Sequence, residues 1–177
     1  MIKTDKAAPE NTQGVAFVGS KQIIYPGKEY TMTEIKVFEG ITSVAFSQKL
    51  TSGSAYCEIL DRIGKAGINL DMISADLAVN DTFCIGFTVD DEDLPRLLPL
   101  IKDKDISTPV INCGNVKFII RSQSMINTPG FAARVFSELK NAGCVPILIT
   151  TGVDEISMLV SDSDSADVGK AMAEMFE

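Results

Sequence analysis

The strongest constraint on the fold of this 177-residue chain is an internal repeat, in which one order of predicted elements occurs twice. The helical segment Tyr56–Gly67 aligns with Ala132–Gly143, since both place apolar residues at the same turns and end on Ala-Gly. The strand before each helix also matches, because Val44–Phe46 precedes the first helix and Phe118–Ile120 precedes the second. Each copy therefore predicts a strand, a helix, two strands and a second helix.

The two copies divide into elements at their turn residues. In the first copy we predict the strands Ile41–Ser47, Ile68–Leu77, Phe83–Val89 and Pro109–Cys113 and the helices Ala55–Ala66 and Leu94–Ile101. In the second copy we predict the strands Val116–Arg121, Val145–Thr151 and Ile156–Val160 and the helices Phe131–Ala142 and Asp162–Phe176.

This order predicts an α+β fold of two ferredoxin-like (βαββαβ) units in tandem, each an antiparallel sheet with helices on one face. The expected first unit is 39–113 and the second is 114–177. Residues 1–38 are expected to be an N-terminal arm with short strands at Val15–Val18 and Gln22–Tyr25 and alternating character at Tyr30–Phe38.

The composition of the chain argues against several classes of function. The chain has no His, which excludes His-based acid–base catalysis, Ser–His and Cys–His nucleophiles and zinc sites that use His. Its 16 Lys and Arg against 24 Asp and Glu give a net charge of −8, whereas nucleic-acid binding needs clustered cations. No apolar run reaches the ~20 residues of a membrane helix and the N-terminus has no signal-peptide core, so we expect a cytoplasmic protein without a membrane partner.

The four cysteines have no Cys-x-x-Cys pair and lie in or beside apolar runs, so we expect Cys57, Cys84, Cys113 and Cys144 to be small buried hydrophobes. The acidic runs Asp90–Asp93 and Asp162–Asp167 have no cation-binding spacing and are interpreted as helix starts. We expect neither a metal nor a cofactor.

Two sets of residues carry a family motif. Residues Ala66–Ile73 read Ala-Gly-Ile-Asn-Leu-Asp-Met-Ile. The second copy carries a longer series, at Met125, Pro129-Gly130, Ala132-Ala133-Arg134, Phe136, Glu138, Leu139, Ala142-Gly143, Ile149, Thr151, Ile156-Ser157, Leu159-Val160 and Phe176. Both sets resemble the tandem ACT domains of aspartokinases, and the resemblance covers residues 39–177.

The resemblance implies a regulatory protein that is no enzyme on its own. ACT domains bind small molecules, usually amino acids, between paired units, and in aspartokinases the tandem pair binds lysine or threonine and inhibits the kinase domain. The Lys-Phe-Gly-Gly start of that kinase domain does not occur, and 38 residues are too few for a nucleotide-binding fold. The chain is similar to the separate regulatory subunit of some aspartokinases. This implies a small amino-acid effector, a homodimer formed through ACT pairing, and a separate aspartokinase catalytic subunit as a further partner.

The family pattern places the effector site at the loop after the first strand and at the start of the second strand. Backbone N–H groups at a helix start suit the carboxylate of an amino acid, and Asn or Asp side chains suit its ammonium. Each position also has a simpler interpretation as a helix cap, a turn or a strand-edge residue. The ligand-binding candidates are Gln48, Thr51, Ser52, Gly53, Ser54, Asn69 and Asp71 in copy one and Met125, Asn127, Pro129 and Gly130 in copy two.

Departures from the family pattern favour a site in copy one, around Asn69. Copy one departs at Thr51, where the family has an acidic residue, but it keeps Asn69. Copy two has Val145 where the family has its second Asn. Pro146 follows and lacks the N–H that a ligand carboxylate would use. Two hypotheses stay open: a regulatory protein with a lysine- or threonine-type effector, or a ligand-free dimerisation or scaffold module for a separate catalytic subunit.

Overall fold

The computed structural model describes residues 22–26, 32–49, 55–76, 81–103 and 105–176. The strand predicted at Val15–Val18 and the candidate residues Thr51, Ser52, Gly53 and Ser54 lie outside the described residues. The strands are β1 (Gln22–Pro26), β2 (Met32–Lys49), β3 (Asp71–Ala75), β4 (Thr82–Asp90), β5 (Val110–Ser122), β6 (Leu148–Thr151) and β7 (Glu155–Ser161). The helices are α1 (Ala55–Lys65), α2 (Leu94–Leu97), α3 (Phe131–Asn141) and α4 (Asp162–Phe176), with short 3-10 turns η2 (Asp91–Asp93) and η3 (Gln123–Ile126).

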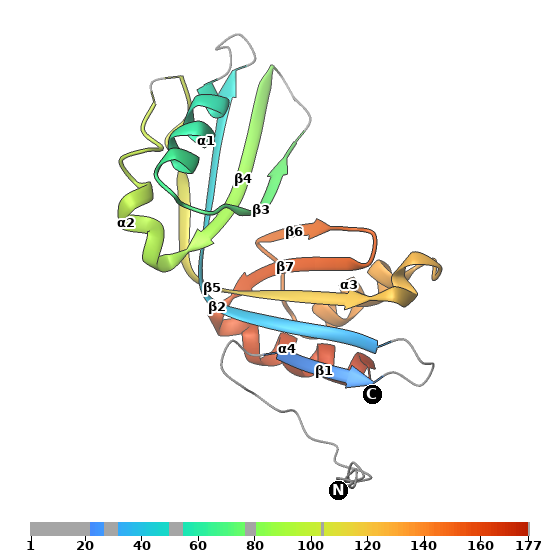
Figure 1. The fold of residues 1–177 in the computed structure, drawn as a ribbon. Helices are drawn as coiled ribbons and strands as arrows, with labels where there is room; N and C mark the ends of the chain where they lie inside the picture. The colour runs from blue at the N-terminus through green and yellow to red at the C-terminus, as the bar shows by residue number, and fades with distance from the viewer. Residues whose placement is uncertain (1–21, 27–31, 50–54, 77–80, 104, 177) are drawn as a thin grey trace, which may run out of the picture.

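One antiparallel sheet runs through the whole fold in the order β3-β4-β2-β5-β7-β6, with β1 also paired to β2. The two long strands β2 and β5 pass through both halves of the molecule (Figure 1). The second half of β2 pairs with β4 and with the start of β5, and its first half pairs with the end of β5. We call residues 41–113 the first lobe, and β1, residues 32–40 and residues 114–176 the second lobe.

Each lobe has the ferredoxin-like order, which confirms the predicted α+β fold. The first lobe runs from the second half of β2 through α1, β3, β4 and α2 to the start of β5. The second lobe runs from the end of β5 through α3, β6, β7 and α4, and its fourth strand is residues 33–38 of β2. The first lobe is thus inserted between the fourth strand of the second lobe and the remainder of that lobe.

The expected boundaries at residues 38/39 and 113/114 both lie inside continuous strands. A glycine follows each boundary closely and interrupts the apolar alternation, which is why the sequence pattern suggests strand ends there. Gly40 and Gly114 have φ values of 70° and 69°, and the β2–β5 register shifts beside them. Positive φ is accessible to glycine at little cost, so the strands turn at bulges and continue.

A polar network holds this turning point. The Asp91 carboxylate accepts hydrogen bonds from the Thr42 hydroxyl and from the Gly114 N–H, the latter at 3.2 Å. The Asn115 amide donates to the carbonyls of Ile41 at 2.9 Å and Asn112 at 2.7 Å. These bonds satisfy groups that the bulge removes from the strand ladder, since buried polar groups need partners.

Two apolar clusters form the cores, one in each lobe, because the helices cover one face of the sheet (Figure 1). The apolar stripe predicted for α1 is buried at Ile59 and Ile63, and that of α3 is buried at Val135 and Leu139. A third, small cluster lies between the lobes. It consists of Ile41, Met72 and Leu159, with Phe38 and Leu148 packed against it.

Several predicted elements are shorter in the structure, among them the strand predicted from Ile68, which begins at Asp71. The helix predicted to reach Ile101 ends at Leu97, two residues before Pro99. The strand predicted from Val145 begins at Leu148, so that Val145 and Ile147 are exposed. No helix in the described part of the chain combines the length and apolar character that a membrane span requires.

The prediction that all four cysteines are buried is wrong for three of them. Cys144 is buried, whereas Cys57, Cys84 and Cys113 are exposed. Cys84 pairs with Ser47 on the face of the first-lobe sheet opposite the helices, and Cys57 is on the solvent side of α1. An apolar run in the sequence does not show which of its residues point outward.

The difference in exposure among the four cysteines predicts which thiols react in the folded protein. Burial, assisted by the nearby Asp164 carboxylate, raises the pKa of the Cys144 thiol to about 11. At pH 8 a thiol reagent should therefore modify three cysteines quickly and Cys144 only on unfolding, because the thiolate is the reactive form. Counting the modified thiols by mass spectrometry, with Cys144→Ala as the control, tests this expectation. Rapid modification of all four thiols in the folded protein would contradict it.

Candidate functional site

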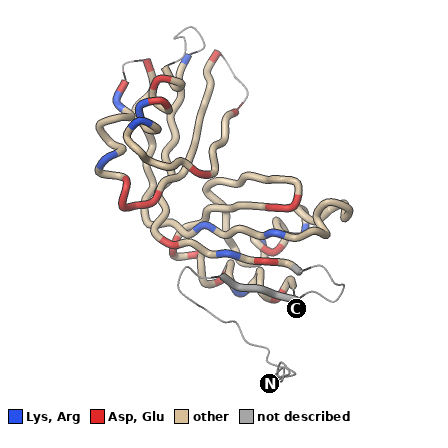
Figure 2. The backbone as a smooth tube through the Cα atoms, in the orientation of Figure 1, with Lys and Arg blue, Asp and Glu red and all other residues tan. Residues whose placement is uncertain are grey.

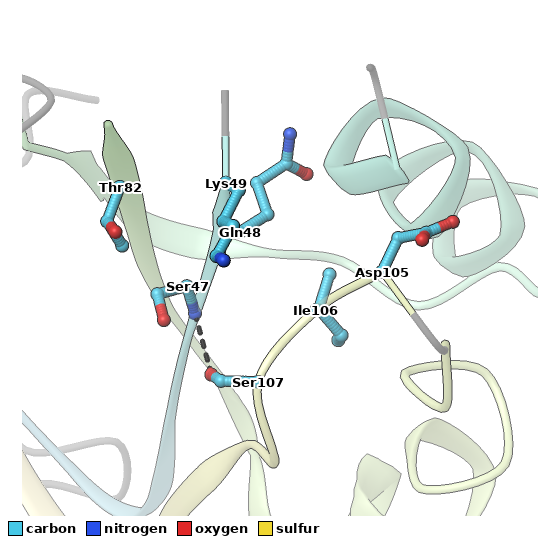
Figure 3. A pocket seen from close by; sticks show the side chains of 7 residues that line it. All are labelled: Ser47, Gln48, Lys49, Thr82, Asp105, Ile106 and Ser107. Carbon is cyan, nitrogen blue, oxygen red and sulfur yellow. Dashed lines mark hydrogen bonds between the residues drawn. The ribbon is translucent and has the colours of Figure 1, made fainter. Parts of the chain in front are cut away.

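A pocket of about 350 Å³ opens at the end of β2 in the first lobe. Figure 3 shows the end of β2, Thr82 at the start of β4 and the segment before β5 around it. Its lining carries hydroxyl groups, an amide, one ammonium group and one carboxylate. The lining residues are Ser47, Gln48, Lys49, Thr82, Asp105, Ile106 and Ser107.

This mixture is suited to a small zwitterion. Lys49 supplies donors for a carboxylate, and Asp105 supplies an acceptor for an ammonium group. Ser47 and Ser107 are bonded to each other in one wall of the pocket: the Ser47 N–H donates to the Ser107 hydroxyl at 2.9 Å, and the Ser107 N–H donates to the Ser47 carbonyl at 2.7 Å. One backbone–backbone bond and one backbone–hydroxyl bond therefore fix this wall, and the charged residues Lys49 and Asp105 are exposed.

Gln48 joins this pocket to α1. Its side chain is 4% exposed, and its amide oxygen accepts a hydrogen bond from the Tyr56 N–H at 2.9 Å. The N–H groups of the first helical turn have no partner within a helix, so Gln48 satisfies one of them. Its position among the candidates is thus explained first by helix capping, and any ligand contact would come in addition.

Asn69 lies at the opposite end of α1, in the segment between α1 and β3, and it is exposed. The turn before it is anchored by Arg96, whose guanidinium donates to the Ala66 carbonyl and pairs with Asp93 at 2.7 Å. Gly67 has a φ of 70° and ends the helix as the sequence predicts. Asn69 is therefore presented at the surface on a turn fixed from α2.

Asp71 begins β3, and its carboxylate already has an ammonium partner. The Lys117 ammonium on β5 forms an ion pair with it, across the two lobes. The Asp71 carboxylate also accepts a hydrogen bond from the Met72 N–H at 2.7 Å. Burial alone would raise the pKa of Asp71, but the bonds from Lys117 and Met72 outweigh it and lower the pKa.

The structure does not bring the first-lobe candidates into one site. Gln48 and Asn69 are at the two ends of α1, which has 11 residues. At about 1.5 Å per residue this separation is about 16 Å, more than an amino acid spans. One amino acid therefore cannot contact both Gln48 and Asn69 of the same first lobe.

The second-lobe candidates have local roles. Met125 packs against the second-lobe core, and Gly130, with a φ of 87°, is the residue before α3. Asn127 and Pro129 are exposed in the turn that leads to it. These residues form a helix start, as the simpler interpretation has it.

The sequence pattern did not identify Lys117, Lys49 or the segment Asp105–Ser107. Lys117 alternates with Val116 and Phe118, which indicates only that it faces away from the helices. Segment 105–107 pairs with β2 through an isolated bridge between Gln48 and Ile106. No local sequence pattern predicts this bridge.

Basic and acidic residues are interspersed in the part of the chain that is described. Figure 2 shows Lys and Arg dispersed among Asp and Glu over both lobes. Several basic residues are paired with acidic ones, including Arg62 with Asp103 at 3.1 Å and Arg121 with Glu155. Within the described ranges, no group of three or more Cys, Asp or Glu could hold a metal ion.

The ACT domain family matches residues 118–176, within the second lobe. The first lobe repeats the same order of strands and helices. The fold is thus that of two ferredoxin-like units in one sheet, of which the second matches the ACT domain.

The resemblance to the ACT region of aspartokinases is also confirmed. The regulatory subunit of aspartate kinase from Thermus thermophilus, in its ligand-free form, has a TM-score of 0.73 and 16% identity; the match covers 81% of this chain and 97% of that subunit. The aspartate kinase of Clostridium acetobutylicum has a TM-score of 0.70 at 16% identity, over 81% of this chain and 34% of that enzyme. The aspartokinase of Geobacillus stearothermophilus is 26% identical over 118 residues, 67% of this chain and 29% of that protein. The chain thus spans less than a third of that aspartokinase.

Proposed function

We propose that this chain is a regulatory amino-acid-binding protein, with an effector of the lysine or threonine type and no catalytic activity of its own. The observation that carries the proposal is the similarity in fold to a regulatory subunit of aspartate kinase over 97% of that subunit's length. Because function belongs to sites and not to folds, the proposal also needs a place for the ligand. The first lobe offers two parts of one, the pocket beside Gln48 and the exposed turn at Asn69.

The two parts are joined if two copies of the chain pair, so that Asn69 of one copy approaches the Gln48 end of α1 in the other. This arrangement explains why both positions match the family pattern although α1 separates them. The proposed partners are therefore a small amino acid, a second copy of this chain and a separate aspartokinase catalytic subunit. The proposed compartment is the cytoplasm.

A second function is favoured by the surface of the second lobe. Val145 is 83% exposed and Ile147 38% exposed, at the positions that align with Asn69 and Asp71 of the first lobe. Exposed apolar side chains suit protein contact better than they suit a zwitterion. In this alternative the chain dimerises or scaffolds a catalytic subunit without a ligand. Copurification with an aspartokinase catalytic chain, without any response to amino acids, would support it.

A thermal-shift screen of the twenty amino acids tests the main proposal. At 100 times its Kd, a ligand that binds only the folded state stabilises it by about 2.7 kcal/mol, which for this size raises Tm by roughly 5–10 °C. We expect such a shift with L-lysine or L-threonine. Asn69→Ala should abolish it, because the exposed amide would be lost.

Val145→Ala is the matched control, since it changes the aligned position of the second lobe and should keep the full shift. The absence of any shift at millimolar concentration of all twenty amino acids would overturn the proposal. A shift that survives Asn69→Ala would move the site away from this turn.

A further inference from the structure

The junction between the lobes contains a buried lysine. Lys117 lies in the centre of β5, in register with Phe38 on β2 and Leu159 on β7. Its side chain is 9% exposed, and its ammonium group is 4.6 Å from the centre of the Phe38 ring. Within the described chain, the carboxylate that meets this ammonium is that of Asp71, from the other lobe. A buried charge is costly unless it is paired, so the docked lobes depend on this contact.

The other side of the contact is held in an unusual conformation. Met72 has a φ of 46°, a backbone conformation that residues other than glycine adopt at a cost in free energy. The β3–β4 register also shifts just after Asp71. This conformation turns the Met72 side chain into the interlobe cluster with Ile41 and Leu159, where it is 5% exposed. It also brings the Met72 N–H onto the Asp71 carboxylate. The surrounding packing thus fixes Asp71 to receive an ammonium group.

Asp71 is also open to solvent. Its side chain is 60% exposed, although Lys117 is buried beneath it. It begins β3, two residues after Asn69 and next to the turn proposed above to meet the effector. The carboxylate therefore has a buried face that holds an internal ammonium and an exposed face that a ligand can reach.

We propose that Lys117 occupies, in the ligand-free protein, the carboxylate that the ammonium of an amino-acid effector engages, so that effector binding and docking of the lobes compete for Asp71. The inference rests on the proposed function, since it names how that site is regulated. When a ligand takes Asp71, Lys117 loses its counter-ion and the docked junction is weakened. The two lobes are joined through β2 and β5, which turn at Gly40 and Gly114 next to this junction, so these bulges are where the lobes reorient.

A comparison of Lys117→Met with the unaltered chain tests the competition. Methionine keeps the length and apolar packing of the side chain and removes its charge. Isothermal titration with L-lysine and with L-threonine should show about tenfold tighter binding to Lys117→Met, because the binding-competent fraction of Asp71 rises. Asp71→Asn should weaken binding at least tenfold in both backgrounds. Lys36→Met is the matched control: Lys36 is on the neighbouring strand and pairs with Glu34 at 3.4 Å, and its removal should leave affinity unchanged.

A measurement without ligand tests the Asp71–Lys117 pair independently of effector binding. Asp71→Asn should lower Tm by roughly 5–10 °C in the unaltered chain, where it strands Lys117, and by less than about 2 °C in the Lys117→Met background. Equal shifts in the two backgrounds would overturn the pairing. Ligand binding that is no tighter in Lys117→Met would overturn the competition alone. If neither protein binds L-lysine or L-threonine, the proposed function fails together with the competition.

Discussion

Replacing Phe118 by Ala is expected to lower the free energy of unfolding by about 3–5 kcal/mol, the range for a large buried aromatic side chain. Phe118 lies on β5, is 2% exposed and belongs to the second-lobe core. A Cβ atom at Gly169 of α4 would lie 3.8 Å from its ring, so the helix backbone packs directly on it. A glycine has no side chain that could move into the cavity, and collapse around it is therefore limited.

Urea unfolding followed by circular dichroism measures this loss, and Phe136→Ala is the control. Phe136 is on α3 of the same lobe but is 46% exposed, so its removal should cost less than half as much. Because β2 and β5 belong to both lobes, amide exchange in the two lobes should accelerate together in Phe118→Ala. Acceleration confined to the second lobe, or similar losses for the two variants, would contradict this account.

Local patterns were sufficient for α1, for α3 and for the class of fold, although not for the end of α2. The apolar stripes of α1 and α3 and the glycines that end these helices are encoded within a dozen residues. The pairing of residues 33–38 with 117–122 is different, since it joins segments that are separated by the entire first lobe. Each half of β2 looks like a separate short strand when Gly40 is interpreted as a terminator.

For the candidate site, the sequence indicated single residues but not their arrangement in space. Resemblance to a family selects Gln48 and Asn69 as candidates, but only the fold shows that they lie at opposite ends of α1. The ion pair of Asp71 with Lys117 depends on the approach of two lobes, and no spacing in the sequence encodes that approach. The outward or inward orientation of Cys57 and Cys84 likewise depends on strand and helix faces that an apolar run leaves undetermined.

A substitution at the β5 bulge, where the two lobes join, is also expected to cause a large loss of stability. Gly114→Val should lower the free energy of unfolding by about 2–3 kcal/mol, because a β-branched residue at positive φ is strained. Gly114 has a φ of 69°, and its N–H donates to the Asp91 carboxylate that also holds Thr42. No atom lies within 4 Å of a Cβ added at this position, so the cost comes from backbone conformation and not from collision. Relaxation of the strain would therefore break the Asp91 contact and disturb the turn of β5.

Gly64→Ala also adds side-chain atoms to a glycine, but it should raise the free energy of unfolding. Gly64 is exposed within α1, and a Cβ there also meets no atom within 4 Å. Alanine should stabilise the protein by about 0.5–1 kcal/mol, since glycine loses more conformational freedom in a helix. Thermal unfolding of the two variants separates backbone strain from the mere addition of side-chain atoms. If Gly114→Val left Tm unchanged, the positive φ would not be required at the junction, and the bulge could not be the point where the lobes are held in their orientation.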